Sequence, residues 1–137
     1  MAWMLVTIIP WALTLVVISV WVRRTPLWWF AVNWFRLVIW GARVILGIQV
    51  RVTGLEHLPA GATSPAILLS KHQSTLETLL LPTLMPHPLA FVFKRELLRI
   101  PFFGWSMARL DMIHIDRESR AAAMKHVIEQ GKAVLSQ

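Results

Sequence analysis

The chain has 137 residues, of which 56% are hydrophobic, and it carries a formal net charge of +7 at pH 7. This length allows at most one modest domain with an appendage, and the lack of cysteine excludes a disulfide framework and thiolate metal sites. The excess of positive charge indicates an anionic partner, either lipid head groups or nucleic acid.

The first 22 residues form an uncharged, apolar segment. At about 1.5 Å per residue, a helix of this length can cross the ~30 Å hydrocarbon core of a bilayer. Arg23 and Arg24 follow the segment, whereas a secretory signal carries its positive charge before the apolar run. The sequence therefore predicts a transmembrane helix that Pro26 ends, with the downstream chain in the cytoplasm.

Residues 27–47 form a second apolar segment of a different kind. Arg36 and Arg43 are seven residues apart and share one helical face. A basic stripe on an apolar helix suits the membrane interface, while a second crossing would bury both arginines at a cost of several kcal/mol. We expect residues 1–47 to form a membrane-associated helical hairpin with one deep and one shallow helix.

Residues 48–137 have the composition of a globular domain. Short apolar or alternating runs predict four strands, at residues 48–53, 65–69, 90–93 and 112–115. Helical spacing predicts helices over residues 76–84 and from Asp116 to the end of the chain. This alternation indicates an α/β fold with a mostly parallel sheet and flanking helices. A crossover helix normally leads to another strand, so we expect the chain to be a fragment.

The segment Lys71-His72-Gln73-Ser74-Thr75-Leu76-Glu77 is the candidate catalytic stretch. It follows a run typical of a strand buried on both faces, so His72 is predicted at the carboxyl end of a strand, where open α/β sheets bind ligands. Two helical residues five apart point about 140° away from each other. His72 must therefore precede the helix if it is to contact Glu77. A carboxylate bonded to one ring nitrogen would leave the other nitrogen able to take a proton, as in a general base.

A structural interpretation of the same residues competes with the catalytic one. Ser74 and Glu77 have the spacing of a capping box, in which their side chains bond the first N–H groups of a helix. We expect Glu77 to be unable to serve fully as both helix cap and partner of His72. From these residues alone, both interpretations stay open.

Lys94 and Arg95 are candidate phosphate ligands at the end of the third predicted strand. They would lie at the same sheet edge as His72 if the strands are parallel. Arginine can bind phosphate with two hydrogen bonds, and lysine supplies a compact charge. The alternative is a solvated basic turn or an ion pair with Glu96.

Other functional classes explain less of the sequence. A non-catalytic, basic membrane anchor would account for the first 50 residues and the charge. A nucleic-acid binder would use the same charge, but seven of the eight tryptophans fall within the first 40 residues and no recognition motif is visible. The remaining histidines have no partner at ligand spacing, so no metal site is expected. The aromatic stretch at residues 100–105 could line a groove, enter the bilayer or belong to the core.

The chain resembles the 1-acyl-glycerol-3-phosphate (lysophosphatidic acid) acyltransferases of bacterial membranes. Four blocks occur in the family's order, at residues 71–77, 93–97, 100–105 and 115–117. The resemblance implies a glycerolipid acyltransferase-like fold at the cytoplasmic face of a bacterial inner membrane. It also implies an acyl thioester of coenzyme A or acyl carrier protein as co-substrate, with no bound cofactor, and membrane lipids and lysophosphatidic acid as partners, without nucleic acid.

The same resemblance assigns roles to individual residues. His72 would be the general base and Glu77 its orienting carboxylate, while Ser74, Lys94 and Arg95 would contact substrate. The family usually has Asp where Glu77 stands, and its later Pro-Glu-Gly-Thr-Arg block is absent because the chain ends first. This truncation would leave the chain possessing only the N-terminal part of the domain, with reduced or no activity. Transfer to glycerol 3-phosphate, another lyso-lipid or a lipid A precursor is the alternative reaction.

Overall fold

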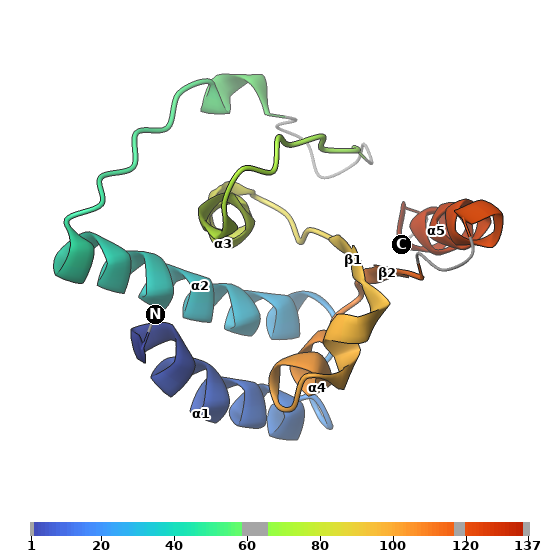
Figure 1. Cartoon of the computed structure of the whole chain (residues 1–137), viewed down its shortest axis with the longest axis horizontal. Helices are drawn as coiled ribbons and strands as arrows, with labels where there is room; N and C mark the ends of the chain where they lie inside the picture. Colours follow the sequence, from blue (N-terminus) through green and yellow to red (C-terminus); the bar gives the residue numbers. More distant parts are fainter. Residues whose placement is uncertain (1, 59–65, 117–119, 136–137) are drawn as a thin grey trace.

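The computed structural model describes residues 2–58, 66–116 and 120–135 of the chain. Its elements are helices and two short strands, which both lie in the second half of the sequence (Figure 1). In chain order they are α1 (Ala2–Ile18), α2 (Thr25–Leu46), η1 (Leu55–His57), α3 (Thr75–Leu84), β1 (Val92–Lys94), η2 (Arg95–Arg99), α4 (Phe103–Met107), β2 (Ile113–Ile115) and α5 (Arg120–Leu135). The described chain is therefore an α/β structure with an N-terminal pair of apolar helices.

Helices α1 and α2 pack side by side through apolar residues near the turn that joins them (Figure 1). Leu15 of α1 contacts Leu27 and Ala31 of α2 in a buried cluster. Two indole groups also connect the helices, since Trp11 Nε1 donates to the backbone oxygen of Phe30 at 3.1 Å. Trp34 Nε1 of α2 donates to the hydroxyl of a threonine in α1 at 3.2 Å. Apolar burial and these hydrogen bonds together fix the pair.

The lengths of the two helices differ from those predicted from the sequence. Helix α1 ends at Ile18, so its 17 residues span about 26 Å, and the chain turns before Arg23. Pro26 does not separate two helices but lies in the first turn of α2, where the missing N–H costs nothing. Among the described helices, α2, with 22 residues, is the one long and apolar enough to cross a membrane by length and composition. The predicted helix over residues 1–22 is therefore shorter than expected, and its crossing of a membrane stays a prediction.

Helix α3 packs against α2 on the side away from α1, so that α2 lies between the other two helices (Figure 1). Leu79 of α3 is buried against Trp34 and Val38 of α2. The chain leaves α3 at Met85, whose backbone is extended, and Pro86 follows. Packing on α2 therefore fixes the position of the first turn of α3, which carries the candidate site.

Strands β1 and β2 form a two-stranded parallel sheet, with Phe93 opposite His114. The strands predicted at residues 90–93 and 112–115 are thus confirmed with three residues each, the first shifted toward Lys94, and the parallel arrangement is as expected. Helix α5 lies beside β2, where the side chain of Gln130 bonds both backbone groups of His114. These bonds, at 3.2 and 3.0 Å, satisfy an edge that would otherwise present unpaired N–H and C=O groups.

The other two predicted strands are wrong. Residues 48–53 and 66–69 have irregular backbone, and Ile67 and Leu69 are 79% and 91% exposed. Pro65, which the second prediction included, lies outside the described residues. Apolar side chains alone do not make a strand, which also needs a neighbour to pair its backbone groups. Figure 1 shows the chain before α3 running apart from β1 and β2.

Candidate active site

The first turn of α3 is organised by Ser74, which caps the helix. Its backbone is extended, with φ −149° and ψ 178°, and its hydroxyl accepts the backbone N–H of Leu76 at 3.1 Å. Glu77 completes the capping box by bonding back to the N–H of Ser74 at 2.7 Å. These contacts satisfy N–H groups that a helix start leaves without intrahelical partners. The capping box predicted from the sequence is therefore present.

The carboxylate of Glu77 also holds His72. Its Oε1 accepts from His72 Nδ1 at 3.0 Å, from the N–H of Gln73 at 2.5 Å and from the N–H of Ser74. Its Oε2 accepts from the hydroxyl of Ser74 at 2.6 Å. The expectation that capping and binding of His72 exclude each other is wrong. His72 lies just before the helix, so its ring and the backbone N–H groups approach the same carboxylate.

The hydrogen bonds decide the protonation of this pair. The hydroxyl of Ser74, followed by its backbone N–H, lowers the pKa of Glu77 to about 2. Glu77 is therefore ionised at neutral pH, and an ionised carboxylate can only accept hydrogen bonds. The hydrogen in the shared bond must then be on Nδ1 of His72. In the neutral ring this leaves the lone pair on Nε2, the atom required of a general base.

The His72 ring is open to solvent, whereas its partner is partly covered. The His72 side chain is 76% exposed and that of Glu77 is 23% exposed. A substrate hydroxyl can therefore reach the ring without displacing packed side chains. One ring nitrogen is thus held by Glu77 and the other is accessible, which is the arrangement that a general base requires.

Lys94 and Arg95 bind carboxylates in the structure. Lys94 Nζ lies 3.1 Å from Glu96 Oε1, which is the local ion pair considered above as the alternative to phosphate binding. Arg95 lies 3.5 Å from Asp116 Oδ2. Because His72 follows no strand, the prediction that it shares a sheet edge with these cations is wrong. Their predicted contact with substrate phosphate stays a prediction.

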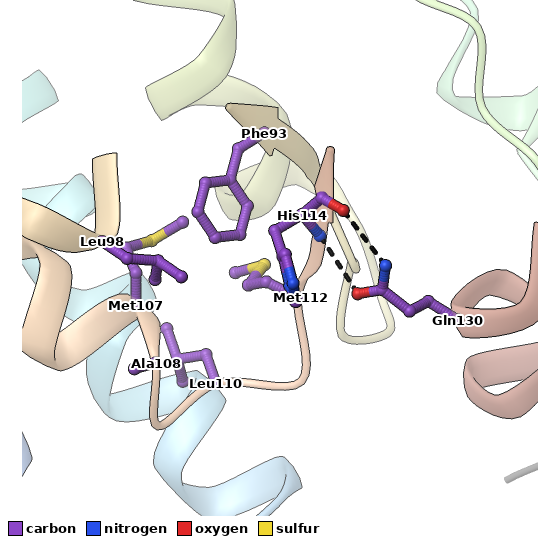
Figure 2. Close-up of a pocket in the computed structure, with 8 residues that line it drawn as sticks. All are labelled: Phe93, Leu98, Met107, Ala108, Leu110, Met112, His114 and Gln130. Atoms are coloured by element: carbon purple, nitrogen blue, oxygen red, sulfur yellow. Dashed lines mark hydrogen bonds between the residues drawn. The ribbon is translucent and has the colours of Figure 1, made fainter. Parts of the chain in front are cut away.

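A separate cavity of about 330 Å³ lies beside the sheet (Figure 2). Its lining is mostly apolar and consists of Phe93, Leu98, Met107, Ala108, Leu110, Met112, His114 and Gln130. His72 and Glu77 are not among these residues. Methionine side chains adapt easily to apolar molecules. No sequence pattern predicts this cavity, because its residues come from separate segments with no common motif.

The fold and the site together define an α/β protein with a histidine–carboxylate pair at a helix start, attached to a pair of apolar helices. The sequence profile of the family described as Acyltransferase matches residues 49–136. The chain belongs to this acyltransferase family.

Curated relatives agree with this assignment. A Pseudomonas aeruginosa protein named 1-acyl-sn-glycerol-3-phosphate acyltransferase is 48% identical over 75% of this chain and 38% of its own length. A Saccharomyces cerevisiae protein of the same name is 35% identical over 60% of this chain and 26% of its own length. A Mus musculus relative named 1-acyl-sn-glycerol-3-phosphate acyltransferase alpha is 32% identical over 74% of this chain and 35% of its own length. The chain thus matches about a quarter to two fifths of these relatives, and no solved structure matches it.

Proposed function

We propose that the protein transfers a fatty acyl chain from an acyl thioester to the sn-2 hydroxyl of lysophosphatidic acid, which makes phosphatidic acid. The observation that carries the proposal is the 3.0 Å contact between His72 Nδ1 and ionised Glu77. In the neutral ring this contact leaves the lone pair of Nε2 able to accept a proton. The names of the relatives support the choice of reaction and acceptor.

The proposed reaction is a direct transfer. Nε2 of His72 takes the proton of the acceptor hydroxyl as its oxygen attacks the thioester carbonyl carbon. Glu77 stabilises the imidazolium that forms, because its negative charge lies against Nδ1. The tetrahedral intermediate then collapses, the carbon–sulfur bond breaks, and the proton passes from Nε2 to the leaving thiol. Each proton removed is returned, so no further reactant is needed.

The proposed roles of the remaining predicted residues follow from their contacts. Ser74 is already bonded to Glu77 and to the first turn of α3, so it positions the base as well as facing the substrate. Lys94 and Arg95 would exchange their carboxylate partners for the phosphate of the acceptor. Both ion pairs are exposed, and such pairs are worth about 0–1 kcal/mol, so this exchange is inexpensive.

Helix α2 is compatible with membrane association, and we propose that it and α1 enter one leaflet without crossing. Leu110, which follows α4, packs onto the cluster near the turn of the helix pair, while α3 packs farther along α2. The rest of the chain thus contacts both ends of the pair, which disfavours a crossing. Exposed apolar residues of α1 and α2 would then face lipid: Leu5, Val6, Ile9, Leu13, Val17, Trp40, Val44, Ile45 and Leu46.

The compartment and the acyl donor complete the proposal. We place the protein at the cytoplasmic face of a bacterial inner membrane, where coenzyme A and acyl carrier protein thioesters are available. Each methylene of the acyl chain buried in an apolar environment contributes about 0.8 kcal/mol. A site held against the membrane therefore favours long-chain substrates that are already in the bilayer.

The test of this proposal replaces His72 with Ala and measures thiol release from an acyl thioester in the presence of lysophosphatidic acid. We expect a loss of about 10²- to 10⁴-fold, the usual contribution of a general base. The matched control is His57→Ala, because His57 is also exposed and lies 3.6 Å from a glutamate. A loss below tenfold for His72→Ala, or an equal loss for the control, would contradict the proposal.

A further inference from the structure

A second cavity, of about 270 Å³, lies where α2 begins. Residues from four separate segments line it, including Arg24, Thr25, Trp28, Leu89, Arg109 and Val134. His72, Glu77, Lys94 and Arg95 are not part of its lining. Whatever this cavity binds is therefore held by groups other than those of the candidate active site.

The start of α2 favours an anion. In the described structure no side chain caps this 22-residue helix, and Arg24 precedes it with a φ of 58°. The unpaired N–H groups of a first turn carry partial positive charge, which the aligned peptide dipoles of a long helix reinforce. Thr25, the first residue of the helix, lines the cavity. A negatively charged ligand in the cavity would lie against this positive end.

A buried donor in the same cavity lacks a partner. Trp28 is 4% exposed, and within the described residues its indole Nε1 has no hydrogen-bond acceptor. Buried N–H groups are nearly always paired, because an unpaired one loses its bonds to water without replacement. Since Trp28 lines the cavity, an acceptor oxygen of a ligand bound there is the natural partner.

Two arginines add positive charge to the cavity. Arg24 and Arg109 come from segments 85 residues apart, and both side chains are exposed. The ion pairs found across the described ranges involve neither of them. Asp111 is the one acidic residue in the lining, so the cavity has a net formal charge of +1. A guanidinium group can bind two phosphate oxygens at once, which makes phosphate the anion that this lining suits.

We propose that this cavity binds the phosphate of an anionic membrane lipid, separately from the catalytic site. Lipid rather than free phosphate is favoured by the residues just before Arg24. Val20 and Trp21 are 63% and 78% exposed and lie in the turn between the two apolar helices. They offer apolar contact to acyl chains while Arg24, Arg109 and the indole N–H of Trp28 bind the head group. The site would anchor the helix pair to anionic bilayers.

The test follows the Trp28 indole directly. Indole ¹H–¹⁵N signals of the protein in maltoside micelles are recorded by NMR, and the Trp28 signal is assigned with Trp28→Phe. Dihexanoylphosphatidic acid should shift this signal in a saturable way. Combined Arg24→Gln and Arg109→Gln substitutions should weaken binding at least tenfold. The matched control Arg51→Gln removes an exposed charge outside the cavity and should leave the affinity within twofold.

A variant that binds the lipid more tightly would show that the changes in affinity do not result from loss of folding. Asp111→Asn removes the one carboxylate in the lining and should tighten binding about threefold, because like charges repel. No saturable shift with the lipid, or an equal effect of Arg51→Gln, would overturn the proposal. An equal shift with inorganic phosphate at the same concentration would overturn the assignment to a lipid and leave a site for free phosphate. None of these results depends on catalysis by His72.

Discussion

Replacing Glu77 with Gln separates the charge of this side chain from its geometry. Three N–H groups converge on Oε1, so the amide oxygen of the glutamine should occupy that position. Its NH₂ group should then take the position of Oε2, where the Ser74 hydroxyl can accept instead of donate. The contacts of the carboxylate are thus preserved while its negative charge is lost.

The expected loss of rate in Glu77→Gln is modest because the hydrogen bonds of this side chain are kept. His72 stays oriented, but the imidazolium formed during transfer loses its charged partner, and charge-assisted hydrogen bonds are about twice as strong as neutral ones. We expect the rate to fall about tenfold for Glu77→Gln. Glu77→Ala also removes the orientation, so its loss should approach the 10²- to 10⁴-fold expected for His72→Ala.

The assay is acyl transfer under single-turnover conditions, with circular dichroism to confirm that helix content is unchanged. In the double variant His72→Ala/Glu77→Ala, the second change should add little, because the two residues act as one unit. Multiplicative losses in the double variant would refute the reasoning, as would full activity of Glu77→Gln.

Two further predictions concern the capping box and the close packing of the chain. Ser74→Ala removes the largest cause of the low pKa of Glu77, so a ¹³C NMR titration of the carboxyl should show the midpoint rise from about 2 toward 4.5. Because the folded pKa is lowered, ionised Glu77 stabilises the native turn above about pH 4.5, and this stabilisation is lost as the pH falls through 2. Gly104→Ala should destabilise the fold by about 1–3 kcal/mol in urea unfolding, since a Cβ would collide with backbone of η2. Gly131→Ala should instead stabilise α5 by about 0.5–1 kcal/mol, because its Cβ would make ordinary contact.

Each of these predictions has a contradicting result. An unchanged midpoint in Ser74→Ala would mean that the hydroxyl does not control the carboxylate. Equal urea midpoints for the two alanine variants would mean that η2 and α4 are not packed as closely as described.

Local patterns predicted the His72–Glu77 contact and the capping box because both depend on residues close together in the sequence. The five-residue separation of His72 and Glu77 required the ring to precede the helix, and it does. The spacing could not show that both carboxylate oxygens are used, which depends on where the N–H groups of Gln73 and Ser74 point. The Lys94–Glu96 ion pair is predictable from the sequence because its two residues are close together, and it is the alternative to phosphate binding. The contact of Arg95 with Asp116 is not predictable in this way, because it depends on the parallel register of β1 and β2.

The strands show the limit of the same approach. The apolar run at residues 65–69 has the composition of a buried strand, but pairing depends on a neighbour that composition does not reveal. The runs that became β1 and β2 form strands because they pair with each other. The chain between them forms η2 and α4. The end of α1 at Ile18 was missed because hydrophobicity continues through the turn to Val22 and hides it.

We infer that His72 carries its proton on Nδ1, held by Glu77, and accepts the substrate proton on Nε2. The direct test is the ¹⁵N NMR spectrum of the protein with labelled histidine, recorded at a pH where the His72 ring is neutral and assigned with His72→Ala. A protonated Nδ1 and a bare Nε2 are predicted. A protonated Nε2 would contradict the account, because that nitrogen could then accept no proton from the acceptor hydroxyl.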